Sequence, residues 1–298
     1  MIRTRTTYNP VPIKRKQADA ILCSDIHLRE DTPTCWIGDF QKEQWDALNF
    51  VKVLQEVHSC PVFHAGDLFH HWKPSPWLLS RTTQNLPKDF ISVYGQHDLP
   101  QHNIELVEKC GMWNLMLNGK LCILQQGHWG WEPLGGRGMI IKNRETLVWH
   151  HMTYIKPPFP GASGGQADTI LRKYPQFDLI VTGDNHQSFS TSVDGRLLVN
   201  PGSLTRQTAD QIDFQPRVAL WYAETNTIEW VNIPIQQNAI TREHLEVKEQ
   251  RNERIGAFIS KLDGDWVAGM SFEENLKAFF EKNNTRDSVK QIIYTAIE

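Results

Sequence analysis

Carboxylate and imidazole side chains recur in this chain at points where short apolar segments end. In the first case, the apolar run Ala20–Cys23 is followed closely by Asp25 and His27. Such a run is typical of a buried strand, and residues two apart on a strand point to the same side of it. If the extended conformation persists, a carboxylate oxygen and an imidazole nitrogen lie side by side and form half of a divalent-metal site.

Four later apolar segments end in the same way. The polar residues that follow them are Asp67, then Gln96, His97 and Asp98, then His150 or His151, and finally Asp184 and His186. One such ending could be a hydrogen-bonded loop, but five are hard to explain by packing because buried carboxylates and imidazoles need partners. The pattern predicts one shared site, and we prefer His150 to His151 because it directly follows its strand.

The donor types of this shared site indicate what it binds. Oxygen and nitrogen ligands without a thiolate suit two hard-to-borderline cations such as Mn²⁺, Mg²⁺, Fe²⁺ or Zn²⁺. Two cations about 3.5–4 Å apart hydrolyse phosphate esters by lowering the pKa of a bound water, holding the phosphate and neutralising the developing charge. The residues themselves favour a two-metal phosphoesterase.

The elements that must position these residues alternate along the first half of the chain. Apolar residues at helical spacing predict helices over residues 40–58 and 76–84, and apolar runs predict strands between them. These strands span residues 20–23, 61–65, 90–94, 119–126, 146–149 and 178–182, and hairpins follow over 188–199 and 218–231. Strands that alternate with helices predict an α/β sheet with its site at the carboxyl edge. Residues 156–166, rich in Pro and Gly, are expected to form an irregular rim that faces the substrate.

The chain divides by composition into a basic N-terminal arm (residues 1–17), a main domain (18–232) and a small, mostly helical region (233–298). The arm carries five Lys and Arg residues and no acid, which fits either a solvated tail or an arm that contacts phosphates. Helices of the last region are expected over 241–262, after a capping box of Ser271 and Glu274, and over 288–298. Their apolar faces need a surface to pack on, in the main domain or in a partner.

Composition excludes several classes of protein. The 298 residues carry a net charge of −3, so the chain as a whole is not a basic nucleic-acid binder. It has no apolar run long enough to span a membrane, and its N-terminus lacks the apolar segment of a secretory signal. Five cysteines without a C-x-x-C pair indicate a reducing compartment, so we expect a cytoplasmic protein that does not contact a membrane.

The order of these motifs resembles the calcineurin-like metallophosphoesterase superfamily over residues 18 to about 232. The matching motifs are Asp25-x-His27, Gly66-Asp67, Gly95-Gln96-His97-Asp98, a strand-end histidine and Gly183-Asp184-Asn185-His186. The resemblance implies a four-layer α-β-β-α sandwich with a small, mostly helical C-terminal region. Within the superfamily, Gly66–His70 resembles the SbcD-type exonuclease subunits of DNA double-strand-break repair, whereas Asn200–Ser203 is common to the superfamily and discriminates little.

The resemblance also implies a role for each motif residue. The metal ligands would be Asp25, His27 and His186 for the first ion, Gln96, His150 and Asp184 for the second, and Asp67 as the bridge between them. His97 would donate a hydrogen bond or a proton near the scissile phosphate, oriented by Asp98, and His70 would lie beside the leaving group or sugar.

Two positions depart from the family pattern. The family usually has Asn where Gln96 stands and His where Asp184 stands. Gln96 keeps the amide oxygen but adds a methylene, and Asp184 replaces a neutral nitrogen by an anionic oxygen. Three carboxylates in the ligand set favour Mn²⁺ or Mg²⁺ over Zn²⁺, and both departures concern the second ion.

A DNA nuclease that uses two divalent ions, with Mn²⁺ preferred, is the function that we predict from these features. A rim with Trp129, Trp131, Arg137 and Lys156 could stack on or grip a strand, although such aromatic residues also serve as core or loop anchors. In the relatives this subunit dimerises and works with an ATPase, so the resemblance implies DNA, an SbcC-like ATPase subunit and a second copy as partners. The alternatives are a phosphodiesterase or phosphatase acting on a small nucleotide or a phosphoprotein, and a catalytically weak scaffold of the same fold.

Overall fold

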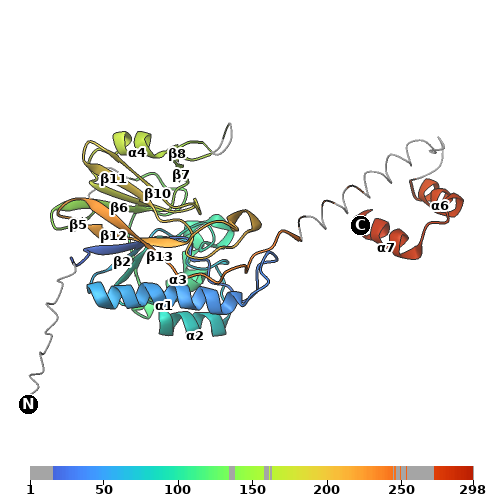
Figure 1. Cartoon of the computed structure of the whole chain (residues 1–298), viewed down its shortest axis with the longest axis horizontal. Helices are drawn as coiled ribbons and strands as arrows, with labels where there is room; N and C mark the ends of the chain where they lie inside the picture. The colour runs from blue at the N-terminus through green and yellow to red at the C-terminus, as the bar shows by residue number, and fades with distance from the viewer. Residues whose placement is uncertain are drawn as a thin grey trace, which may run out of the picture. The chain divides into compact units, whose positions relative to one another are not determined.

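Two facing β-sheets form the centre of the larger part of the computed structural model, which describes residues 16–133, 138–157, 161, 163–243, 245, 249, 253 and 272–297 (Figure 1). The six-stranded sheet has the order β13 (Thr227–Asn232), β12 (Arg217–Tyr222), β1 (Ala20–Cys23), β2 (Val62–His64), β3 (Phe90–Ser92) and β4 (Cys122–Ile123). The five-stranded sheet has the order β10 (Phe189–Val193), β11 (Arg196–Asn200), β9 (Leu179–Thr182), β6 (Arg144–Trp149) and β5 (Met139–Ile141). β1 to β4 run parallel to one another, as do β6, β9 and β11, so the carboxyl ends within each set share one edge.

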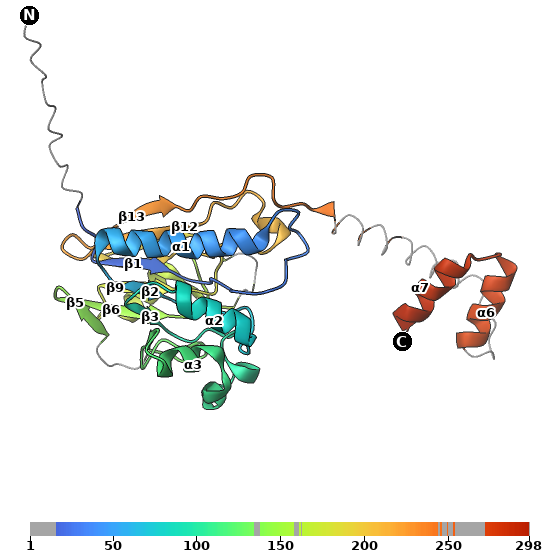
Figure 2. The same cartoon turned by 90° about the horizontal axis from the view of Figure 1, so that it is seen from below.

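Helices cover the outer face of each sheet and complete four layers (Figures 1 and 2). The helices are α1 (Phe40–His58), α2 (Pro76–Asn85) and α3 (Gly111–Leu117) on the six-stranded sheet, and α4 (Ala167–Lys173) on the five-stranded sheet. Strand alternation explains the layers, because Ile21 and Cys23 pack toward α1 whereas Ala20 and Leu22 pack between the sheets. The mixed α/β fold that we predicted is confirmed.

Local sequence signals explain where the helices begin and end. The Asp39 side chain accepts the backbone N–H of Lys42 at 2.9 Å and caps α1, which ends at the left-handed residue Ser59. The Ser75 side chain caps α2 in the same way, and Pro76 occupies the first helical position. The predicted helix over residues 40–58 is confirmed.

Short elements account for the differences between prediction and structure. Of the strand expected over residues 119–126, only β4 is paired. Residues 156–166 are not wholly irregular, because β8 (Gly165–Gln166) pairs in parallel with β7 (Thr153–Tyr154). The sequence did not predict α3 or α4, since seven residues are too few for a clear helical period. Three 3₁₀ turns also lie in this part: Pro100–His102, Ile104–Lys109 and Ala209–Gln211.

Contacts divide the chain into two compact units, Met1–Ala239 and Ile240–Glu298. In the second unit, α6 (Phe272–Lys282) and α7 (Asp287–Ile297) bury Leu276, Phe279, Phe280 and Ile293 against one another. The N-terminal arm up to residue 15, most of the predicted helix over 241–262 and Ser271 of the predicted capping box lie outside the described residues. The three-part division at residues 17 and 232 therefore stays a prediction.

Among the described residues, no helix combines the length and the apolar character that crossing a membrane requires.

Candidate metal centre

The predicted site residues converge where the carboxyl edges of the two sheets meet. The structure forms three groups there: Asp25 with His27 and His186, Asp25 with Asp67 and His150, and His27 with His70 and His97. Within each group, one ligand atom from each residue lies within 4.8 Å of the others. Parallel strands place their carboxyl ends at one edge, which is why residues far apart in sequence meet.

The backbone of four of these residues is left-handed rather than extended. The φ angles are 48° at Asp25, 49° at His27, 58° at Asp67 and 75° at Asp184. The expectation that Asp25 and His27 point the same way because the strand continues is therefore wrong, since β1 ends at Cys23. They converge because the chain turns, held by N–H bonds from Asp25 to the Gly66 carbonyl and from His27 to the Asp67 carbonyl, both 3.0 Å. Strained residues of this kind cluster at functional sites.

The first half-site consists of Asp25, His27 and His186. The Nε2 atoms of the two histidines face each other at 3.2 Å, and each lies 3.9 Å from Oδ1 of Asp25. Nδ1 of His27 is buried and has no hydrogen-bond partner among the described residues. Burial, with four neighbouring histidines adding to its effect, holds the pKa of His27 well below its usual value, so His27 is a neutral ligand.

Asp67 lies between the two halves of the site. Its Oδ1 accepts the backbone N–H of His97 at 2.9 Å, whereas Oδ2 lies 3.7 Å from Nε2 of His27 and 3.6 Å from Nε2 of His150. Oδ2 is buried and has no hydrogen bond within the described part of the chain, and burial raises the pKa of Asp67 well above its usual range. An unpartnered carboxylate oxygen between two imidazoles fits a divalent cation, because such a buried oxygen otherwise carries the cost of its desolvation.

The second half-site consists of Gln96, His150 and Asp184, which are hydrogen-bonded to one another. Oε1 of Gln96 lies 2.6 Å from Nε2 of His150, and Nε2 of Gln96 donates to Oδ1 of Asp184 at 2.7 Å. Nδ1 of His150 donates to the Ala65 carbonyl at 2.6 Å. In this arrangement both ring nitrogens of His150 are hydrogen-bonded.

The surroundings of His150 raise its pKa. Burial alone would lower its pKa, but the carboxylates of Asp67, Asp25 and Asp184 outweigh burial, so the pKa lies above its usual value. The neighbouring His151 instead stacks on Trp149, with ring centroids 3.9 Å apart, and belongs to none of the three groups. The structure thus places His150 rather than His151 among the candidate ligands.

The Asp98 carboxylate forms hydrogen bonds with backbone N–H groups rather than with the His97 ring. Its carboxylate accepts N–H bonds from Gly95, Asp67, Leu68 and Phe69 at 2.8–3.3 Å. The predicted orientation of His97 by Asp98 is therefore wrong. Both carboxylate oxygens are occupied by the turn, and burial raises the pKa of Asp98 to about 6.

His97 and His70 form a pair beside the first half-site. Nδ1 of His97 donates to the His70 carbonyl at 2.8 Å, and the two rings stack with centroids 5.4 Å apart. Burial lowers the pKa of both, that of His70 to about 4. The predicted positions of His97 and His70 near the metal ligands match the third group, while their catalytic roles stay predictions.

Glycines at two strand ends leave room for these side chains. Gly66 has φ +93°, and a Cβ there would lie 2.4 Å from Nδ1 of His150. A Cβ on Gly95 would lie 2.1 Å from Oδ1 of Asp67. Any side chain at either position would displace a candidate ligand.

Sequence reasoning missed the residues that support the ligands. The Asn200 side chain donates to the carbonyls of Asn185 and Gln187, at 2.6 and 2.7 Å, and so fixes the loop on both sides of His186. The Ala65 carbonyl fixes His150. The Asn200–Ser203 motif is visible in the sequence. Because the motif is common to the superfamily, we did not infer from it that Asn200 fixes the loop around His186.

The aromatic rim is only partly described. The Trp129 ring lies 5.4 Å from that of His102, whose Nδ1 bonds to the Gln96 carbonyl, and Trp131 is exposed. Arg137 lies outside the described residues. Stacking of a strand on these tryptophans stays a prediction.

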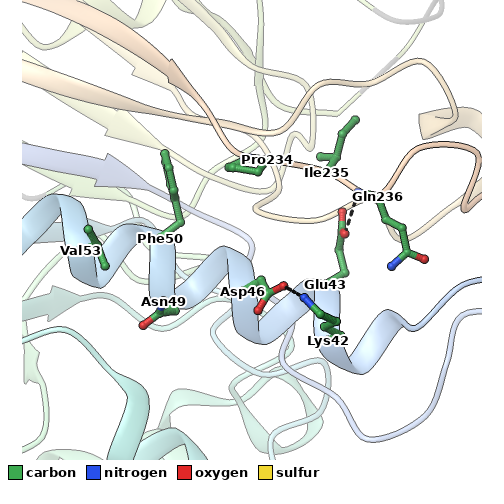
Figure 3. A pocket seen from close by; sticks show the side chains of 9 residues that line it. All are labelled: Lys42, Glu43, Asp46, Asn49, Phe50, Val53, Pro234, Ile235 and Gln236. Carbon is green, nitrogen blue, oxygen red and sulfur yellow. Dashed lines mark hydrogen bonds and ion pairs between the residues drawn. The ribbon is translucent and has the colours of Figure 1, made fainter.

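A separate pocket of about 470 Å³ between α1 and Pro234–Gln236 contains none of the predicted site residues (Figure 3). Its charged side chains are already paired, because Lys42 bonds to Asp46 and the Glu43 carboxylate accepts the Gln236 N–H at 3.0 Å. We therefore place the functional site at the sheet edges and not in this pocket.

Comparisons with known proteins found one family model and several similar solved structures. A family model described as the calcineurin-like phosphoesterase superfamily domain matches residues 19–225. Similar solved structures include an archaeal phosphodiesterase (15% identity, TM-score 0.43, 72% of this chain and 98% of that chain) and a metallophosphoesterase from Sphaerobacter thermophilus (15%, 0.37, 73% and 89%). A Vps29 single mutant from Entamoeba histolytica is also similar (16%, 0.38, 72% and 99%). The comparison with curated proteins finds no match.

Proposed function

This chain belongs to the calcineurin-like phosphoesterase superfamily, and from that premise we propose that it is a metal-dependent phosphodiesterase that cleaves DNA. Metal-dependent phosphoester hydrolysis is the activity that the family implies. The observation that carries the proposal is the convergence of both half-sites, bridged by Asp67, with the His97–His70 pair at one side. The resemblance of Gly66–His70 to SbcD-type subunits supports DNA as the substrate.

The ligand residues have the donor set for two divalent ions, with Mn²⁺ as the ion that we propose. Asp25, His27 and His186 would hold one ion, Gln96, His150 and Asp184 the other, and Asp67 would contact both. Bound there, such ions lower the pKa of a coordinated water and neutralise charge on the phosphate.

His97 would act on the substrate through Nε2. Its Nδ1 carries a hydrogen because it donates to the His70 carbonyl, so neutral His97 has a lone pair on Nε2. An anionic phosphate nearby favours the protonated ring, which then donates from Nε2 to a phosphoryl or leaving oxygen. The stacked His70 limits where the sugar or leaving group can lie.

A pocket of about 140 Å³ beside His70 supports a substrate longer than one phosphate group. The basic residues that line it are Arg29, His70, His71 and Lys73, together with the acids Glu30 and Asp31. Arg29 pairs with Asp31, and Glu30 accepts a hydrogen bond from Ser75, so the acids are already engaged. His71 and Lys73 are then available to a neighbouring phosphate of a polynucleotide.

The test is cleavage of end-labelled single- and double-stranded DNA by the purified chain as Mn²⁺ is titrated. We expect cleavage that depends on Mn²⁺ and falls at least about 100-fold in His97→Ala, since general acid–base groups contribute about 10²–10⁴-fold. His151→Ala is the matched control, because His151 lies outside the three ligand groups, and it should retain activity.

Other outcomes would redirect the proposal. Hydrolysis of bis-p-nitrophenyl phosphate without DNA cleavage would overturn DNA as the substrate and favour a small nucleotide. Inactivity on both substrates, in the presence of Mn²⁺ and a candidate SbcC-like ATPase partner, would favour a scaffold. That partner and a homodimer are themselves proposals, and exposed apolar residues of α7, such as Ile292, are compatible with either.

A further inference from the structure

The two half-sites differ in the spacing of their ligand atoms, which is 3.2 Å between the two histidines of the first and 2.6–2.7 Å around Gln96 in the second. From this difference we propose that the chain binds its two divalent ions with unequal affinity, the first half-site tightly and the second only at higher ion concentration. The inference rests on the proposed metal-dependent function, but it concerns the binding of ions rather than turnover.

The first half-site is already spaced for an ion. Two imidazole nitrogens bound to one tetrahedral ion, at about 2.0–2.1 Å each, lie roughly 3.3 Å apart. Nε2 of His27 and Nε2 of His186 lie 3.2 Å apart, and Oδ1 of Asp25 lies 3.9 Å from both. The backbone N–H of Asp184 donates to both Asp25 oxygens, at 3.1 and 3.2 Å, and holds that carboxylate in place. An ion can enter here with little movement of the histidines.

The second half-site is closed by its own hydrogen bonds. Ligands around an ion with bonds of about 2.1 Å are roughly 3.0 Å apart or more. The contacts of Gln96 are shorter, 2.6 Å to His150 and 2.7 Å to Asp184. An ion that binds all three side chains must therefore separate Gln96 from both neighbours and break both hydrogen bonds.

The neighbours of Gln96 cannot easily move to make that room. His150 is fully buried and bonded to the Ala65 carbonyl, and the backbone of Asp184 is bonded to Asp25. When an ion binds, the side chain that must move is therefore that of Gln96, which is only partly buried. Breaking two hydrogen bonds corresponds to about a tenfold loss of affinity or more for the second ion.

The experiment is a Mn²⁺ titration of the full chain, stripped of metal with a chelator, followed by calorimetry and by electron paramagnetic resonance. We expect one ion per chain to bind first and to give the signal of isolated Mn²⁺. The signal of a spin-coupled pair should grow only after the first equivalent, with a dissociation constant at least about tenfold higher. A coupled signal from the first addition, or two ions of equal affinity, would overturn the proposal.

Two alanine variants assign the tight site. His186→Ala should abolish the tight binding, whereas Gln96→Ala should retain it, and both side chains are only partly buried. The opposite pattern would place the tight ion in the second half-site and refute the assignment. Circular dichroism checks that each variant is folded, and the wild-type titration decides the question of unequal affinity even if one is not. Because no substrate is present, a failure of this inference is distinct from a failure of the proposed DNA cleavage.

Discussion

The two half-sites contain similar side chains and lie side by side, yet their ligand atoms are spaced differently. In the first, Nε2 of His27 and Nε2 of His186 lie 3.2 Å apart, a separation that one bound ion can span, and in the bridge Asp67 Oδ2 has no partner among the residues that the structure describes. In the second, a continuous chain of hydrogen bonds runs from the Ala65 carbonyl through His150 and Gln96 to Asp184. Candidate ligands can thus be spaced for an ion or drawn together by their own hydrogen bonds, and the distances between their ligand atoms distinguish the two cases.

The substitution that we expect to have the largest effect on stability and activity is Gly66→Ala, which distorts the second half-site. Gly66→Ala forces a Cβ against the His150 ring at a φ of +93°, so we expect a loss of about 3 kcal/mol in the free energy of unfolding and loss of hydrolysis. Urea unfolding and a phosphodiesterase assay measure both. Gly119→Ala is the matched control, because Gly119 also has positive φ but a Cβ added there would meet no described atom within 4 Å, and it should cost only about 1 kcal/mol.

A second change weakens the support of the first half-site. Asn200→Ala leaves the carbonyls of Asn185 and Gln187 without their donor, and Asn200 is fully buried. We expect about 2 kcal/mol of destabilisation and weaker binding of the tight ion, because the loop that carries His186 is released. Chemical unfolding and Mn²⁺ calorimetry test this. Unchanged affinity in a destabilised variant would show that Asn200 serves folding alone.

His128 offers a comparison with His150, because burial lowers the pKa of His128 whereas carboxylates raise the pKa of His150. Burial lowers the pKa of His128 from its ordinary value of 6.5 to about 4, and its Nδ1 accepts the Tyr94 N–H at 3.2 Å. The unfolded chain binds a proton more readily than the folded chain, so this histidine makes stability fall as the pH drops from about 6.5 toward 4. Between pH 7 and pH 5 the loss is about 2 kcal/mol.

His128→Asn tests that contribution, because asparagine can keep an acceptor for Tyr94 without titrating. Unfolding free energies of wild type and variant should differ in their pH dependence by about 2 kcal/mol between pH 7 and pH 5. Parallel curves would show that another group causes the acid sensitivity.

The substitution that we expect to have the smallest effect on stability is Gln96→Asn, which tests the difference in ion affinity between the two half-sites. Gln96→Asn removes one methylene, so the amide no longer reaches both His150 and Asp184, and the second half-site opens. We expect the second Mn²⁺ to bind up to about tenfold more tightly, with a change in stability below about 1 kcal/mol. Calorimetry gives the affinity, and Asp184→Asn, which keeps an acceptor for Gln96, is the control that should leave the second half-site closed.

Much of the fold was predictable because it depends on local patterns. Alternation in β1 sends Ile21 and Ala20 to opposite faces, and the apolar spacing of residues 40–58 predicts α1 with its observed bounds. Each strand of these parallel sets ends at the same edge, so the sequence alone indicated that Asp25, Asp67 and Asp184 would gather. Short elements such as α4 were missed because seven residues carry little periodic signal.

What the sequence by itself determined is which residues reach the sheet edges, because the length of each apolar run and the polar residues after it are local features of the sequence. Only the tertiary structure decided what those residues do there. Gln96 meets His150 and Asp184 across 54 and 88 positions of sequence, between two different sheets, and no local pattern encodes that contact. Asp98 likewise binds the turn that begins at Asp67 and not the adjacent His97 ring. Hydrogen-bond partners at a shared edge depend on distances of a few tenths of an ångström, which are fixed only when both sheets pack.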